Sequence, residues 1–239
     1  MRLKFIIWIL LVYRFSLAQN QTLPGIIPSL FYKGRITNRL DYNIFASTTF
    51  IPIKSTIEGK ELSPRNSEVY LQPGLIYKYS KELNFAIGYT FINASSFSSI
   101  AETRHQVWQQ VIFEHKFLKG YMHHRLRLIE NAVKDIAPQF NYQIAFEKPL
   151  QGRQLDAKEI YFTCFNESFI NLSKHPTNIL LSNWLFVGIG YKTSSIGNFE
   201  FGPLIQAYFN NEDKSQNTLL LFQLLWLTDY KLHDRQKSN

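Results

Sequence analysis

The chain has 239 residues, of which 45% are hydrophobic and 15% aromatic, and its formal net charge is +8. This composition excludes a disordered chain and predicts one domain of the larger all-β kind. The moderate basic excess does not indicate nucleic-acid binding. It fits the acidic headgroups of a membrane, or an anionic solute, better.

Residues 1–18 have the pattern of a secretory signal peptide. Arg2 and Lys4 precede an apolar run from Phe5 to Tyr13, and Ser16-Leu17-Ala18 resembles a cleavage site. A membrane anchor is the alternative, but roughly 20 apolar residues are needed to span a bilayer, and Arg14 interrupts this run. We therefore expect cleavage, which removes three basic residues and lowers the net charge from +8 to +5.

The mature chain is expected to be exported without disulfide bonds. Its single cysteine, Cys164, cannot form an internal disulfide, which argues against a disulfide-stapled secreted domain. No later segment has the length and polarity of a spanning helix, so membrane insertion would require a β-barrel.

Alternation of apolar and polar residues predicts strands along the whole mature chain. Between Gln139 and Glu147, for example, Phe140, Tyr142, Ile144 and Phe146 share one face. The expected strands are Leu30 to Ile36, Leu40 to Ile51, Glu68 to Tyr79, Leu83 to Ile92, Glu102 to Phe117, Tyr121 to Glu130, Gln139 to Glu147, Glu159 to Glu167, Asn183 to Lys192, Asn198 to Phe209 and Leu219 to Asp229.

These strands predict an all-β fold, a single antiparallel up-and-down transmembrane β-barrel of about 10–12 strands. Because bacterial single-chain barrels have an even number of strands, ten or twelve are expected, with one strand merged or missed. Short connectors such as Ser80-Lys81 alternate with longer ones such as Lys54 to Ser67 and Leu150 to Lys158. We expect a lead-in over 19–29, the barrel over 30–230 and a polar tail over 231–239.

The same alternation would suit a soluble β-sandwich or a lipocalin-like binding protein. Two features favour the membrane barrel: the polar faces carry Gly, Gln, Asn and Glu rather than many Lys, and many of the expected strands have about the 9–11 residues of a membrane strand. Pro73 and Pro203 lie inside strands, where each removes a hydrogen-bond donor, so both are expected at bulges or rims.

The densest polar region is the hairpin formed by Glu102 to Phe117 and Tyr121 to Glu130. The polar face of this hairpin and the polar face of the next strand predict a ladder of charged residues that faces the lumen. In this ladder Glu114 is expected opposite Arg125. The ladder either plugs the lumen with paired charges or contacts a solute. The predicted lumen-lining residues are Glu102, Arg104, Gln106, Gln110, Glu114, Lys116, His123, Arg125, Arg127, Gln139, Asn141, Gln143 and Glu147.

Neither a metal site nor a catalytic site emerges from the sequence. His123 and His124 point to opposite faces of one strand, so they cannot share an ion. Outer-membrane lipid hydrolases place a histidine and a serine close together on one strand, as in His-x-Ser, and the chain lacks that motif. Ser173 and His175 come nearest, in an expected loop. No catalytic residue, metal or cofactor is therefore predicted.

Several segments resemble one known family. Asn166-Glu-Ser-Phe-Ile-Asn-Leu, the run from Asn183 to Lys192, the run from Asn198 to Gln206, Glu114-His-Lys-Phe and His124-Arg-Leu-Arg-Leu are similar to an uncharacterised outer-membrane β-barrel family of Bacteroidetes. That family is catalogued as a domain of unknown function. The resemblance covers nearly the whole mature chain and implies a fold and a location but no activity.

The sequence thus predicts a non-enzymatic, porin-like barrel in the outer membrane of a Gram-negative bacterium. Its polar lumen would serve a structural or narrow-pore role. The expected partners are outer-membrane lipid and a small polar or anionic solute, with no nucleic acid and an unknown partner protein. The alternatives are an outer-membrane lipid hydrolase with an unrecognised site and a soluble binding protein.

Overall fold

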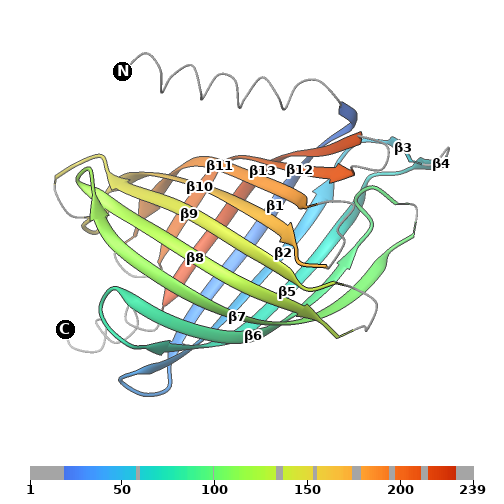
Figure 1. Cartoon of the computed structure of the whole chain (residues 1–239). Coiled ribbons are helices and arrows are strands. Elements are labelled where there is room, and N and C mark those ends of the chain that lie inside the picture. The colour runs from blue at the N-terminus through green and yellow to red at the C-terminus, as the bar shows by residue number, and fades with distance from the viewer. Residues whose placement is uncertain are drawn as a thin grey trace, which may run out of the picture.

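A computed structural model describes residues 19–57, 60–98, 100–132, 137–152, 155–173, 179–193, 197–210 and 215–229. These residues form a closed barrel of eleven strands and a separate two-stranded hairpin (Figure 1). The predicted signal peptide and the C-terminal tail lie outside the described residues. The barrel strands are β1 (Gln19–Arg35), β2 (Leu40–Ile51), β5 (Arg65–Lys78), β6 (Leu83–Ala94), β7 (Glu102–Phe117), β8 (Gly120–Asn131), β9 (Gln139–Pro149), β10 (Ile160–Asn171), β11 (Leu180–Lys192), β12 (Asn198–Asn210) and β13 (Ser215–Asp229), and the hairpin strands are β3 (Ser55–Ile57) and β4 (Lys60–Leu62).

The all-β barrel is confirmed, but the expectation of an even number of strands is wrong. Neighbouring strands pair antiparallel all the way from β1 through β2 to β13, and β1 then pairs parallel with β13 from Thr22 opposite Thr218 to Lys33 opposite Asp229. When consecutive strands alternate in direction, the last of an odd number of strands runs in the same direction as the first. The closing pair of β1 and β13 must therefore be parallel. A closed barrel also excludes the β-sandwich.

The segment expected as a lead-in, residues 19–29, is the first half of β1. Pro24, Gly25 and Pro28 gave it the composition of a loop. Proline is tolerated in this strand because the antiparallel ladder with β2 has pairs at Ile26 and from Ser29 onward, leaving Pro24 and Pro28 out of it.

The two ends of the barrel differ in their connections. One end, which we call the loop end, carries the β3–β4 hairpin and the junctions from β2 to β5, β6 to β7, β8 to β9, β10 to β11 and β12 to β13. The other end, which we call the turn end, carries the junctions from β1 to β2, β5 to β6, β7 to β8 and β11 to β12. The connection over 150–159 joins β9 to β10 at this turn end, so it is an exception to the predicted division into long loops and short turns.

The β7–β8 hairpin has a register two residues away from the predicted one. Leu118 and Lys119 both have positive φ angles, 45° and 62°, and form a two-residue turn that places Phe117 opposite Gly120. This turn geometry matches the twist of a hairpin. As a result Glu114 lies opposite His123, and Arg125 lies opposite Ile112.

Pro73 and Pro203 do not sit at bulges or rims. The register of β5 against β6 is the same on both sides of Pro73, and the register of β11 against β12 is the same on both sides of Pro203. The irregularities fall elsewhere among the described strands: between Gln19 and Gln21, between Thr49 and Phe50, and between Phe169 and Ile170. Each proline therefore removes a ladder bond without shifting its strand.

The outside of the barrel is apolar. Large hydrophobic side chains are exposed on every barrel strand except β9, and Ile87 of β6 is 60% exposed. Inward side chains of the opposite parity are buried and include many polar groups, for example Gln72, Gln110 and Glu167. No helix among the described residues is long and apolar enough to cross a membrane.

Candidate functional site in the barrel interior

A buried carboxylate organises the centre of the polar wall. Glu167 of β10 accepts a charge-assisted hydrogen bond of 2.8 Å from Arg125 of β8. It also accepts from Asn141 Nδ2 and Gln143 Nε2 of β9, each at 3.3 Å. Its side chain is 5% exposed. Arg125 thus neutralises the carboxylate, and three donors from two strands hold it in place, which is how a buried charge is normally kept.

A second polar cluster surrounds Arg127 of β8. Its Nε donates to Gln110 Oε1 at 2.8 Å, and its guanidinium lies 4.6 Å from the centre of the Trp108 ring. With its amide oxygen turned toward these donors, Gln72 of β5 accepts from Arg127 Nη1 at 2.7 Å and from Trp108 Nε1 at 2.9 Å. Because β5 and β8 are three strands apart, this cluster fills the space between them.

The Trp108 ring fits flat against the wall because of the glycine opposite. Gly88 of β6 is the strand partner of Trp108, and a Cβ atom at Gly88 would overlap the indole ring. Tyr161 of β10 is related to Gly190 of β11 in the same way. Glycine at these positions lets large aromatic rings lie inside the barrel.

Carboxylates and one histidine lie toward the turn end. His123 Nδ1 is 3.5 Å from Glu114 Oε1, and His123 Nε2 is 3.9 Å from Glu147 Oε1. Beyond them, Tyr161 donates to Glu200 Oε1 of β12 at 2.8 Å. Glu114 and Glu147 have side chains 40% and 38% exposed, so this end of the interior is open to solvent.

One part of the interior is an apolar cluster. Inward residues of β1, β2 and β11–β13 form one buried cluster, which we call the apolar core: Leu23, Ile27, Ile51, Phe186, Leu204, Leu219 and Leu221. The same strands also carry buried polar residues, such as Asn43 of β2, Gln206 of β12 and Gln223 of β13, so the polar lumen expected from the alternation contains an apolar part. The expectation assumed that every strand keeps its apolar residues on the outside.

A loop residue closes the loop end over the apolar core. Phe97, in the connection between β6 and β7, packs against the core, and its ring centre lies 5.5 Å from that of Tyr208 on β12. In the strand order of the barrel, β12 lies opposite β6. Phe97 therefore crosses the barrel mouth from one wall to the other.

The predicted lumen residues all lie on the inward parity of β7, β8 and β9. The structure brings Gln110 to Arg127, brings Asn141, Gln143 and Arg125 to Glu167, and brings Glu114 and Glu147 to His123. Gln106 donates to Asn131 at 2.9 Å. Glu102 and Lys116 are exposed at opposite ends of β7, Arg104 lies near the loop end, and Gln139 lies at the start of β9. Contact of any of these groups with a solute stays a prediction.

Sequence reasoning missed Glu167, Gln72 and Glu200, which complete these clusters. Each lies on a strand that the alternation predicted, but its inward neighbours are apolar, small or aromatic, such as Phe165 and Phe169 beside Glu167. For Glu167 and Glu200, an isolated acidic residue at an inward position of the strand was the signal that could have been used. The pairing of Glu167 with Arg125 joins strands that are not neighbours, so no hairpin register predicts it.

The clusters contain neither a metal site nor a complete hydrolytic site. Within the described residues there is no group of three His, Cys, Asp or Glu side chains that could hold a metal ion. Cys164 lies on the outward parity of β10, opposite Phe146 and Val187. Ser173 and His175 are the serine and histidine that come nearest to a hydrolase motif in the sequence. His175 lies outside the described residues. Chemically, the interior offers paired charges and side-chain hydrogen bonds, and some of its buried polar atoms, such as Arg125 Nε and Asn141 Oδ1, have no hydrogen-bond partner.

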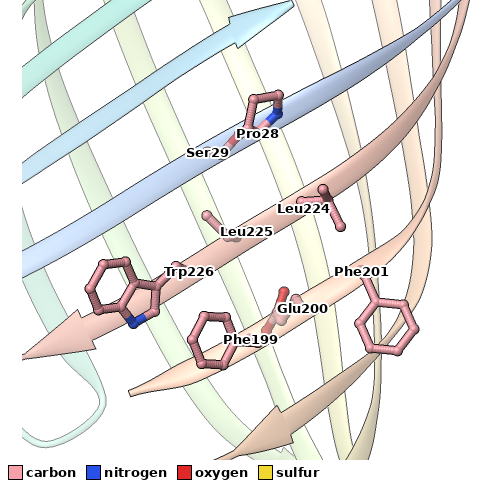
Figure 2. A pocket seen from close by; sticks show the side chains of 8 residues that line it. All are labelled: Pro28, Ser29, Phe199, Glu200, Phe201, Leu224, Leu225 and Trp226. Atoms are coloured by element: carbon pink, nitrogen blue, oxygen red, sulfur yellow. The ribbon is translucent and has the colours of Figure 1, made fainter. Parts of the chain in front are cut away.

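An apolar groove of about 210 Å³ lies on the outer wall beside the closing seam. Figure 2 shows its lining, to which Phe199 and Phe201 of β12, Leu224 and Trp226 of β13 and Pro28 of β1 contribute. The Phe199 and Trp226 rings stack with centres 5.9 Å apart. The groove is thus shaped by outward aromatic residues near the turn end.

Comparison with known proteins identifies a family but no activity. No curated protein matches the chain. Among solved structures, LpxR from Salmonella typhimurium matches with a TM-score of 0.49 and 8% sequence identity, covering 79% of this chain and 83% of that one. The family described as "Protein of unknown function (DUF2490)" matches residues 28–217. The chain belongs to this family of unknown function.

Proposed function

We propose that the chain is a non-enzymatic barrel that spans the outer membrane of a Gram-negative bacterium and has a filled interior. The observation that carries the proposal is the outer wall. Exposed apolar side chains such as Ile26, Leu75, Ile87, Val187 and Phe222 surround the barrel. A soluble protein rarely exposes so continuous an apolar surface, whereas a membrane barrel turns that surface to lipid.

Aromatic residues support this orientation in a bilayer. Tyr77, Phe117, Tyr191, Phe199 and Trp226 are exposed near the turn end, on five different strands. Such a girdle marks a membrane interface. In outer-membrane barrels the short turns face the periplasm and the longer loops face the outside, which would place the β3–β4 hairpin outside the cell. The apolar groove in Figure 2 would then hold an acyl chain.

The filled interior supports a structural or partner-binding role over an open pore. The Arg127 and Glu167 clusters occupy one part of the interior, and the apolar core with Phe97 occupies another part. The expected narrow pore for a small polar or anionic solute would require these side chains to move apart. The Bacteroidetes source implied by the family resemblance stays a prediction.

The lipid-hydrolase alternative receives less support. His124 of β8 and Ser168 of β10 share the outer wall, but β9 lies between their strands, and His124 Nδ1 instead pairs with Tyr142 Oη at 2.8 Å. A hydrolytic serine needs its base within about 3 Å. Reaction of the folded protein with a serine-directed probe, or release of fatty acid from phospholipid, would favour the alternative.

Two matched variants test membrane insertion. Ile87 lies in the middle of the outer wall and is 60% exposed, and Ile100 lies in a loop and is 70% exposed. Arginine on the lipid face of a membrane barrel costs about 2–4 kcal/mol at the midplane. We expect Ile87→Arg to reduce the fraction of protein that folds into lipid vesicles, measured as the band whose gel mobility changes on boiling, and Ile100→Arg to leave it unchanged. Equal behaviour of both variants, with protein that stays soluble without detergent, would contradict the proposal.

A further inference from the structure

The two ends of the barrel differ in the exposed charges that they carry. Among the described residues, six exposed Lys and Arg side chains lie at the turn end, against two exposed acidic residues, Glu82 and Asp156. At the loop end the exposed charged residues are two lysines, Lys54 and Lys60, and three glutamates. The exposed charges therefore make the turn end basic and the loop end slightly acidic. We call the six basic residues of the turn end the basic rim: Arg35, Arg39, Lys81, Lys116, Lys119 and Lys158.

Cations of the two ends also differ in their partners. At the loop end, Lys54 forms an ion pair of 3.3 Å with Glu61. Within the part of the chain that the structure describes, Lys81, Lys119 and Lys158 of the basic rim form no such pair. These three ammonium groups are exposed and come from three different junctions of the turn end. Their charge is available to an anion from outside the chain.

Two cations of the basic rim sit on backbone that a residue with a Cβ atom rarely adopts. Lys119 has a φ angle of 62° and Lys158 one of 67°, values in the left-handed region that favours glycine. Among the described residues, the other non-glycine position with positive φ is Leu118. A disfavoured backbone conformation at residues that carry a long charged side chain points to a use for that side chain.

The basic rim begins where the apolar outer wall ends. Tyr79, two residues before Lys81, is 68% exposed, and Phe117, two residues before Lys119, is 44% exposed. Exposed aromatic rings of a membrane barrel lie at the level of the lipid headgroups. A lysine side chain just beyond such a ring keeps its ammonium group in the polar layer. The rim cations would therefore lie at the depth of the lipid phosphates.

We propose that the basic rim binds the phosphate groups of anionic phospholipids in the leaflet that surrounds the turn end. The inference rests on the proposed membrane insertion and adds the kind of lipid that this end selects. Clustered basic residues at a membrane surface attract anionic headgroups, and exposed cations without an acidic partner can form charge-assisted hydrogen bonds to phosphate. With the turns toward the periplasm, the selected lipids would lie in the periplasmic leaflet.

Two reporter positions on one strand test the basic rim against the loop end. In the full chain with Cys164→Ser, Tyr77→Cys places a thiol four residues from Lys81, and Val69→Cys places one on the same outward face of β5, toward the loop end. The replaced side chains are 42% and 44% exposed, and the strand between them spans about 26 Å. Each thiol carries a fluorescent label in vesicles made of equal parts phosphatidylglycerol and phosphatidylcholine. A trace of either lipid, with a nitroxide near the carbonyl end of its acyl chain, quenches the label more strongly the more of that lipid lies beside it.

We expect nitroxide-labelled phosphatidylglycerol to quench about twice as strongly as nitroxide-labelled phosphatidylcholine at Tyr77→Cys, and the two lipids to quench equally at Val69→Cys. Lys81→Gln with Lys119→Gln should lower the ratio at Tyr77→Cys to the ratio at Val69→Cys. Lys81→Arg with Lys119→Arg should keep it, because arginine retains the charge. Salt at about 1 M, where the Debye length is about 3 Å, should act like the glutamine variants.

The outcomes separate the lipid contact from membrane insertion. A ratio that is equal at the two reporter positions, or that survives the glutamine substitutions, would overturn the lipid selectivity of the basic rim and leave the membrane barrel in place. Failure of the Cys164→Ser chain to enter vesicles, judged by a gel mobility that does not change on boiling, would instead contradict the proposed function. The glutamine substitutions lie at exposed turn positions, so these variants should fold, and the same gel assay verifies it.

Discussion

Arg125 of β8 and Glu167 of β10 form an ion pair of 2.8 Å that reaches across the intervening strand β9. The carboxylate is 5% exposed and the guanidinium-bearing side chain 25% exposed. Asn141 and Gln143, on β9 itself, complete the coordination of the carboxylate. One buried acid therefore ties three consecutive strands together on the inside of the barrel.

Replacing Glu167 by leucine should be strongly destabilising. It leaves Arg125 without its partner inside the barrel, and breaking a buried pair from one side costs about 3 kcal/mol. Urea unfolding of the barrel folded in vesicles measures this loss. The double variant with Arg125→Leu should lose less than the sum of the two single variants. A sum that is strictly additive would show that the two groups are not coupled.

The turn between β7 and β8 should accept glycine with a gain in stability. Lys119 has a φ angle of 62°, a conformation that costs a residue with a Cβ atom about 1–2 kcal/mol. After allowing for the entropy that glycine loses, Lys119→Gly should raise the free energy of unfolding by about 0.5–1 kcal/mol. Lys116→Gly, three residues earlier in the extended strand, is the control and should lower it.

A methyl group at Gly190 should strain the wall of the barrel. Its Cβ atom would overlap the ring of Tyr161, which is fully buried and donates to Glu200. Overpacking of this kind costs about 1–3 kcal/mol, so Gly190→Ala should unfold at lower urea concentration. Adding Tyr161→Leu should recover part of the loss from the alanine. An unchanged midpoint for Gly190→Ala would show that the ring moves aside freely.

Phe97 should control access to the apolar core from the loop end. In a Cys164→Ser background, Leu219→Cys places a thiol at a core position that is 1% exposed. We expect Phe97→Ala to increase the labelling rate of that thiol by a water-soluble maleimide about tenfold, equivalent to about 1.4 kcal/mol of opening free energy. Ser98→Ala, in the same loop, should leave the rate unchanged. Equal rates in the two variants would contradict the closing role of Phe97.

The strands were predictable because successive side chains of a barrel strand face the outer wall and the interior in turn. Their polarity therefore alternates along the sequence. The inward parity of Arg125, Arg127, Asn141 and Gln143 follows from that alternation alone. The register of the β7–β8 hairpin was not predictable, because Leu118 and Lys119 occupy a turn that usually selects Asn and Gly. A positive φ angle at a residue such as leucine or lysine leaves no recognisable pattern in the sequence.

The apolar core could not be predicted for a different reason. Phe186, Leu204 and Leu221 face inward on strands whose outward residues are also apolar, so alternation carries little information there. The first half of β1 was hidden by Pro24 and Pro28, which are tolerated because the ladder with β2 does not use them. Closure between β1 and β13 is a contact between the two ends of the barrel, which local pattern does not encode.

Conductance across a planar bilayer tests the filled interior most directly. Barrel folded in detergent, verified by its change in gel mobility on boiling, is added to one side of the bilayer and the current is recorded at increasing voltage. The Arg127, Glu167 and apolar-core clusters predict a current no different from that of detergent alone. Stable single-channel steps that disappear in Arg125→Glu would contradict the account, because they would show that ions pass through the interior beside that side chain.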